Sequence, residues 1–191
     1  LCDDLIKIGS KRKNNLYDIN LLLCKKCIII CNQVQIKEKI LFPSTYHYRG
    51  KLTNDVLLGQ INLVKNIELK YGNLKNKLFI DIGCNDGALL DILAKKNAKT
   101  LGVEPTSAAN DCKSTHNIYK NFFNIKIAKK IKKKYPKIDF ITFTNVFAHI
   151  NKLEELIKSL KILINDNTVI VIENHYIGSI LKTKQFDTFY H

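Results

Sequence analysis

The residues best suited to chemistry in this chain are residues 81–87, which read Asp-Ile-Gly-Cys-Asn-Asp-Gly directly after a short apolar run. A glycine-containing turn after a strand is where an open α/β sheet meets nucleotide-like ligands, because glycine lets the backbone come close to the ligand. Glu104 ends the next apolar run, about 20 residues further on, where an acidic side chain can hold ribose hydroxyls. Together the two features predict a nucleoside-type cofactor site.

This turn is poorly suited to a pyrophosphate. Gly83 and Gly87 flank Asn85, so the G-x-G-x-x-G pattern of dinucleotide sites is absent, and the carboxylates of Asp81 and Asp86 repel phosphate. S-adenosylmethionine has no phosphate and carries a sulfonium and an amino group, which these carboxylates favour. We therefore expect S-adenosylmethionine as the cofactor. The alternative is a purely structural turn in which Asn85 or Asp86 caps the next helix.

A second candidate segment, residues 142–150, leaves a later apolar run and contains His149. A loop after a strand is where catalytic groups reach a ligand held by the first turn. His149 can titrate near neutral pH and could remove a proton. A structural, hydrogen-bonded histidine explains the residue equally well, and both interpretations stay open.

The elements that position these residues follow from regular alternation. An amphipathic helix is expected over residues 53–71, and Gly72 is placed to end it. β-rich apolar runs lie at 77–82, 100–103, 118–122, 138–144 and 168–173, with helical patterns at 87–96, 106–115, 124–134 and 151–164. Strand and helix alternation with runs buried on both faces predicts an α/β fold with a doubly wound parallel sheet.

Composition narrows the class of protein. The formal charge of +14 comes almost entirely from lysine, and lysine is spread along the whole chain. Solvated lysine faces explain this better than a nucleic-acid surface, which favours arginine. No apolar stretch reaches the ~18 residues of a membrane span, so a cytoplasmic protein is expected.

The order of five segments, residues 41–49, 81–87, 102–106, 144–150 and 186–191, resembles the sugar C-methyltransferase family. The resemblance implies a Rossmann-like class I methyltransferase domain and a nucleotide-linked keto-deoxysugar as substrate. A base would remove a proton beside the keto group, and the enolate would take the methyl group. The implied cofactor residues, with Asp81 added from the turn, are Asp81, Gly83, Asn85, Gly87, Glu104 and Asn145, and the candidate catalytic set is Tyr48, His149, Tyr190 and His191.

The cysteines near the N-terminus fit the same resemblance. Cys24 and Cys27 form a C-x-x-C pair, which in a reducing compartment is more often a metal or redox motif than a disulfide. Family members carry an N-terminal zinc-binding module with two such pairs, so Cys2 is expected as a third ligand, and Cys31 either substitutes or packs. The expected organisation is a zinc module over 1–50, a connecting helix over 51–72 and the methyltransferase domain over 73–191. The missing methionine and the aromatic end at His191 indicate a fragment cut at both ends.

Two rival functions remain. One is methylation of RNA or another macromolecule by the same cofactor domain, and the other is a zinc-knuckle module that binds nucleic acid. Both would use the positive charge, and both predict RNA binding with a steep salt dependence. The second leaves Glu104 and Asn145 unexplained.

Overall fold

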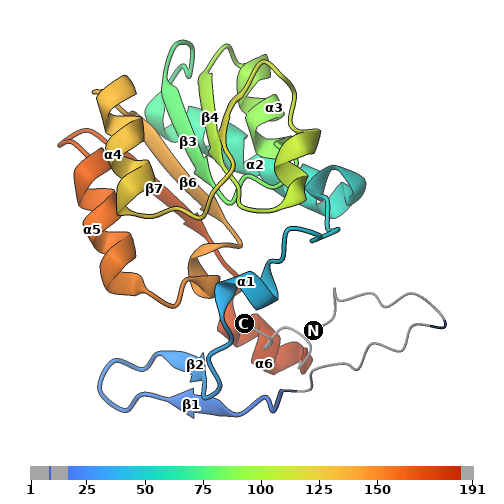
Figure 1. The fold of residues 1–191 in the computed structure, drawn as a ribbon. Coiled ribbons are helices and arrows are strands. Elements are labelled where there is room, and N and C mark those ends of the chain that lie inside the picture. The colour runs from blue at the N-terminus through green and yellow to red at the C-terminus, as the bar shows by residue number, and fades with distance from the viewer. Residues whose placement is uncertain (1–8, 10–16, 186–191) are drawn as a thin grey trace.

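A five-stranded parallel sheet is the centre of the molecule, as the computed structural model in Figure 1 shows; it describes residue 9 and residues 17–185. The strand order is β5-β4-β3-β6-β7. The strands are β3 (Leu78–Ile82), β4 (Lys99–Val103), β5 (Asn117–Tyr119), β6 (Phe140–Thr144) and β7 (Val169–Glu173). Because β3 is central and all five of its residues are buried, the chain segment after it is fixed on a rigid support. The prediction of a doubly wound α/β fold is confirmed.

Helices cover both faces of this sheet. On one face, α2 (Asn54–Tyr71) and α3 (Ala88–Lys95) pack against Phe79 and Phe140. On the other face, α4 (Ile125–Lys134) and α5 (Leu153–Leu163) pack against Ile80, Ile141 and other apolar side chains. Apolar side chains recur every three or four residues in these helices, which directs one stripe of each helix to the sheet. Burial of these stripes holds the helices on both faces of the sheet.

Several predicted boundaries changed. The helix expected over residues 106–115 is wrong, since this segment forms only a 3₁₀ turn, η2 (Ser107–Asp111), followed by a loop. Thr106 caps the turn, because its hydroxyl accepts a hydrogen bond from the Ala108 backbone N–H. Two short helices were not predicted, α1 (Glu38–Leu41) and α6 (Ile177–Thr183), and two further 3₁₀ turns are present, η1 (Gly50–Leu52) and η3 (Phe147–His149).

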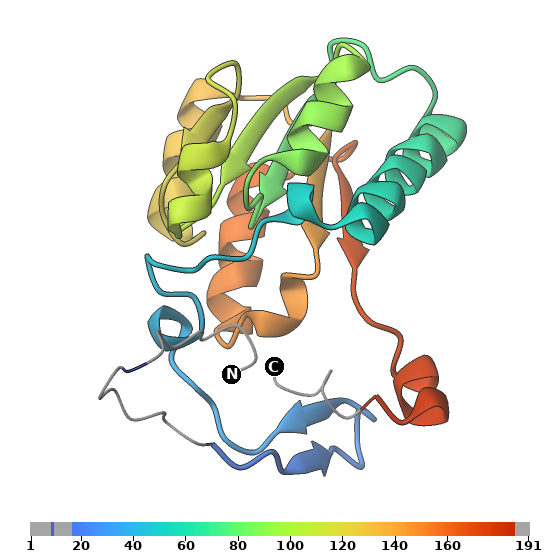
Figure 2. The same cartoon turned by 90° about the vertical axis from the view of Figure 1, so that its right-hand side faces the viewer.

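The N-terminal part contains an antiparallel pair of short strands, β1 (Leu21–Leu23) and β2 (Ile30–Asn32). This hairpin, α1 and α6 lie beyond the carboxyl edge of the parallel sheet in both views (Figures 1 and 2). The three leucines of β1 are exposed. Among the described residues, no helix is long and apolar enough to cross a membrane.

Candidate functional site

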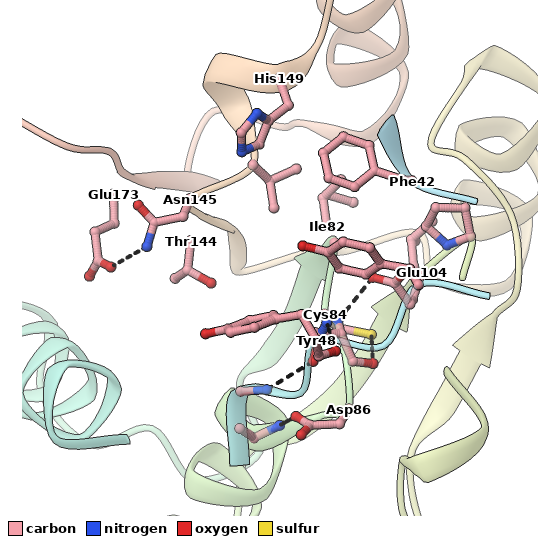
Figure 3. A pocket seen from close by; sticks show the side chains of 18 of the residues that line it. Phe42, Tyr48, Ile82, Cys84, Asp86, Glu104, Thr144, Asn145, His149 and Glu173 are labelled. Atoms are coloured by element: carbon pink, nitrogen blue, oxygen red, sulfur yellow. Dashed lines mark hydrogen bonds between the residues drawn. The ribbon is translucent and has the colours of Figure 1, made fainter. Parts of the chain in front are cut away.

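A cavity of about 450 Å³ lies at the carboxyl ends of β3, β4, β6 and β7 (Figure 3). Parallel strands bring these ends to one edge, so side chains that are far apart in sequence meet there. Six of the predicted site residues line the cavity: Tyr48, Gly83, Asn85, Glu104, Asn145 and His149. Its size falls within the range of ~300–1,000 Å³ that is usual for small-molecule sites.

Glu104 is the most firmly held polar group of the cavity. It follows β4, and only 5% of its surface is exposed. One carboxylate oxygen accepts a hydrogen bond from the Asn85 backbone N–H at 3.0 Å. The other accepts from the backbone N–H of Thr106 at 2.9 Å and from its hydroxyl at 2.6 Å. A carboxylate has about four acceptor positions, so it retains room for a hydroxyl of a ligand.

The turn between β3 and α3 brings its backbone to the cavity through residues with positive φ. Gly83 has φ +74°, and a Cβ at this position would collide with Val146 of the loop after β6. Asn85 also has positive φ, at 50°, which asparagine adopts more readily than most residues. Gly87 ends the turn with φ +78° but does not line the cavity, and a Cβ there would lie 3.1 Å from Cys112 Sγ. Gly87 is therefore placed as a turn and packing residue.

The two acidic residues of the turn occupy different environments. Asp81 lies inside the sheet, 1% exposed, where it accepts a hydrogen bond from the Thr142 hydroxyl at 2.6 Å and does not line the cavity. Burial raises the pKa of Asp81 to about 7, which the Thr142 hydrogen bond opposes and the nearby Glu104 reinforces. Asp86 does line the cavity and accepts hydrogen bonds from the backbone N–H groups of Lys51 and Ala88.

A segment from the N-terminal part closes one side of the site. We call residues 42–51 the strap. Its Gly50 N–H donates to Asn85 Oδ1 at 3.0 Å, and Asn85 Nδ2 donates to the Tyr48 carbonyl at 3.1 Å. Each end of one asparagine side chain is thus bonded to the strap. The cofactor turn and the strap form one unit, although 37 residues separate Tyr48 from Asn85.

Arg49 anchors the strap to η2, a role that its sequence context did not indicate. Its guanidinium pairs with Asp111 and donates to the carbonyls of Tyr46 and Tyr48 at 2.8 and 3.0 Å. It also donates to the Ser107 hydroxyl at 3.3 Å. Since η2 supplies Ser107 and Asp111, the short turn that replaced a predicted helix serves as the anchor of the strap.

His149 belongs to η3 and lies across the cavity from the turn after β3. Its ring packs edge-on against Phe42 of the strap, with centroids 5.3 Å apart. Burial lowers the pKa of His149 to about 4, against the effect of a hydrogen bond with the Asn145 backbone, and the nearby His175 lowers it further. The imidazole is therefore neutral at pH 7 and able to accept a proton. The strap's Tyr46 and Tyr48 also border the cavity.

The polar cavity residues that sequence reasoning did not single out include Asp55, Gln60 and Glu173. Glu173 ends β7 and accepts a long hydrogen bond from Asn145 Nδ2, at 3.4 Å (Figure 3). Asp55 and Gln60 reach the cavity from α2. The position of Glu173 at the end of an apolar run was an available signal, whereas the face that α2 turns toward the cavity depends on packing.

The remaining predicted residues gain no support from the structure. Tyr190, His191 and Cys2 lie outside the described residues. Cys24 and Cys27 are exposed in the turn between β1 and β2, where hydrogen bonds from Cys27 and from the Lys26 backbone lower the pKa of Cys24. Within residue 9 and residues 17–185 there is no group of three or more histidine, cysteine or acidic side chains that could hold a metal ion. Cys84 is buried and lines the cavity, whereas Cys112 is half-buried, and both thiols donate to the Asn85 carbonyl.

Comparison with known proteins identifies the domain. Residues 62–188 match the family model described as a methyltransferase domain. The C-methyltransferase NovU of Streptomyces niveus is 23% identical over 92% of this chain, which spans 42% of that protein's length.

Two solved structures share the fold. A SAM dependent methyltransferase from Archaeoglobus fulgidus has a TM-score of 0.55 and 22% identity, over 74% of this chain and 66% of that one. The plantazolicin methyltransferase BpumL has a TM-score of 0.52 and 20% identity, over 71% of this chain and 53% of that one. At these identities the likeness concerns the fold. The family model itself covers well over half of the sequence, so the chain belongs to the methyltransferase domain family.

Proposed function

We propose that the cavity binds S-adenosylmethionine, with the ribose hydroxyls on Glu104. The observation that carries this proposal is the buried Glu104 carboxylate, held by Asn85 and Thr106 at the edge of the cavity. The acidic lining of the cavity suits this cofactor, because the carboxylates of Glu104, Asp86 and Glu173 disfavour a phosphate. Among the proteins with this fold, BpumL is described in complex with SAH, the demethylated cofactor.

The proposed reaction is C-methylation of a nucleotide-linked keto-deoxysugar. Similarity to a protein named as a C-methyltransferase supports the type of reaction. The sugar class rests on the resemblance of residues 41–49 and 144–150 to sugar C-methyltransferases. Both segments border the cavity, through Phe42, Tyr46 and Tyr48 on one side and Val146 and His149 on the other.

The chain's own residues can handle the proton that such a reaction must move. When bound, S-adenosylmethionine supplies an electrophilic methyl group. Neutral His149 is proposed to take the proton from the carbon beside the keto group, and the Tyr48 hydroxyl to donate a hydrogen bond to the developing oxyanion. Tyr190 and His191 are proposed as further acid/base groups. A full-length protein with His149→Asn that turned over at the wild-type rate would rule out this base assignment.

Calorimetric titration of the chain with S-adenosylhomocysteine tests the cofactor proposal. Wild-type protein should bind at micromolar affinity, and Glu104→Ala should lose at least about tenfold, since hydrogen bonds to a charged group contribute ~1.5–3 kcal/mol. Glu154→Ala is the matched control, because its side chain is 93% exposed on α5. Absence of binding by the wild-type chain would contradict the proposal.

A structural zinc ion at Cys24 and Cys27, with Cys2 as a further ligand, is proposed on the same resemblance. Zinc in such modules needs four ligands, mostly thiolates. Metal analysis of the purified chain and of a Cys24→Ser variant tests this: about one zinc per chain is expected in the first, and a loss in the second. A wild-type chain that contains no zinc would refute it.

A further inference from the structure

The direction of α2 determines which of its residues can reach a ligand. Tyr71, the last residue of α2, packs edge-on against Phe140, the first residue of β6, with ring centroids 5.5 Å apart. The carboxyl end of the helix therefore lies at the amino ends of the strands. Since α2 runs antiparallel to the sheet, its early turns lie at the carboxyl edge, where the cavity is.

The register of α2 places Gln60 beside the end of β7. Val64 and Ile67 belong to a buried cluster against which the partly buried Val169 and Val171 of β7 pack. One helical turn before Val64, on the same face, stands Gln60, and two residues after Val171 the strand ends at Glu173. Helix and strand thus bring Gln60 and Glu173 to the same end of the cavity, and both residues line it.

Gln60 has an unused hydrogen-bond acceptor. Its Oε1 is buried and has no hydrogen-bond partner among the described residues. A buried acceptor in this state is unfavourable, and a donor on a ligand in the cavity that the side chain lines would satisfy it. Glu173 is also incompletely bonded, because its contact with Asn145 Nδ2 is long at 3.4 Å. A neutral acceptor beside a carboxylate is suited to a cationic N–H donor such as an ammonium group.

The strand order indicates which part of the bound ligand lies beside Gln60 and Glu173. Glu104 follows β4, on one side of the central β3, and Glu173 ends β7, on the other side. A ligand whose ribose lies on Glu104 and whose chain crosses the Gly83 turn therefore extends toward Gln60 and Glu173. The amino-acid end of this cofactor, at the far side of its sulfur from the ribose, carries an ammonium group.

We infer that Gln60 accepts a hydrogen bond from the α-ammonium group of the bound cofactor and that Glu173 supplies the opposing negative charge. This inference rests on the proposed binding of S-adenosylmethionine. It makes Gln60 a residue that distinguishes the complete cofactor from its nucleoside part.

The experiment compares two ligands by calorimetric titration of the full chain: S-adenosylhomocysteine, and 5′-methylthioadenosine, which has the nucleoside and sulfur but no amino-acid end. Gln60→Leu should weaken binding of S-adenosylhomocysteine about tenfold, equivalent to about 1.4 kcal/mol, and leave binding of 5′-methylthioadenosine within about twofold. Glu173→Gln should show the same selectivity. Asn62→Leu, an exposed position on the same helix, is the control and should change neither affinity.

Each other outcome overturns the inference. An equal loss for both ligands would mean that Gln60 shapes the cavity without contacting the amino-acid end, and no loss would mean that it makes no contact at all. Because Leu removes an unpaired acceptor, the thermal midpoint of Gln60→Leu should not fall, so weak binding cannot be attributed to unfolding. Failure of the wild-type chain to bind either ligand would instead refute the proposed cofactor, and the inference with it.

Discussion

At the scale of single residues, two buried titratable groups make the free energy of unfolding depend on pH in opposite directions. His149 is held neutral by burial, with its pKa lowered from 6.5 to about 4. Between these two pH values the unfolded chain binds a proton that the folded chain does not. By linkage, the free energy of unfolding falls as the pH drops through this window.

This predicts a shallower pH dependence for His149→Asn than for the wild type. Between pH 7.5 and pH 5, the wild-type thermal midpoint should fall by more than that of His149→Asn, measured by circular dichroism. His47, an exposed histidine of the strap, provides the matched variant His47→Asn. Equal slopes for wild type and His149→Asn would show that His149 is not desolvated in solution.

The contribution of Asp81 to the free energy of unfolding changes with pH in the opposite direction. Burial raises its pKa from 3.8 to about 7, so between these values the folded chain holds a proton that the unfolded chain has lost. The contribution of Asp81 to the free energy of unfolding is therefore present below pH 4 and is lost as the pH rises to 7.

We expect the free energy of unfolding of Asp81→Asn to exceed that of the wild type by more at pH 8 than at pH 5, because the wild type loses the Asp81 contribution progressively as the pH rises to 7. The amide can still accept the Thr142 hydrogen bond but is never charged. Urea unfolding at the two pH values measures this, with the exposed Asp166→Asn as control. Since the side chain lies behind the cavity wall, S-adenosylhomocysteine affinity should stay within about twofold at pH 7. An Asp81→Asn protein that is less stable than the wild type at pH 8 would contradict this account.

At the scale of elements, the turn after β3 and the loop after β6 fit together through one small residue. Gly83 has φ +74° and faces the Val146 side chain. Alanine here should destabilise in two ways, by about 1–2 kcal/mol for the left-handed backbone and by about 1–3 kcal/mol for the collision.

A double-mutant cycle separates the two costs. Val146→Ala removes the colliding methyl groups, so Gly83→Ala should be less damaging in this background, with a coupling of at least about 1 kcal/mol in urea unfolding. Gly59→Ala serves as control, because a Cβ at that helical glycine meets nothing within 4 Å. Strict additivity of the two changes would mean that the loops do not touch in solution.

The elements that could be predicted from the sequence are those whose signal is local. Strand β3 was expected within one residue, because its run of apolar side chains is bounded by turn residues on both sides. The segment after Glu104 was misjudged, since Ser107, Ala108 and Ala109 suit a helix, but Ser107 N–H instead bonds the Ser44 carbonyl of the strap. A contact across 63 positions leaves no periodicity in the sequence. The same reason hid Arg49, whose partners lie in a distant turn.

At the scale of the whole molecule, the site includes residues from both sides of the domain boundary that the sequence predicted. The domain boundary expected near residue 50 falls inside the strap. Yet Tyr48 and Gly50 bond Asn85, and Lys51 bonds Asp86. The cofactor turn is therefore shaped by residues on the N-terminal side of that boundary, and ligand binding should order both sides together.

This coupling predicts a local change in protease sensitivity. A ligand present at 100 times its Kd stabilises the folded state by about 2.7 kcal/mol against global unfolding. If the strap belongs to the site, saturating S-adenosylhomocysteine should slow tryptic cleavage after Arg49 and Lys51, measured by mass spectrometry over time. Cleavage after Lys182 in α6, whose residues do not line the cavity, is the internal reference. Protection of the strap that exceeds protection at Lys182 indicates direct coupling, because global stabilisation would slow both cleavages alike. Equal protection, or none, would mean that the strap stays independent of the ligand despite its bonds to Asn85.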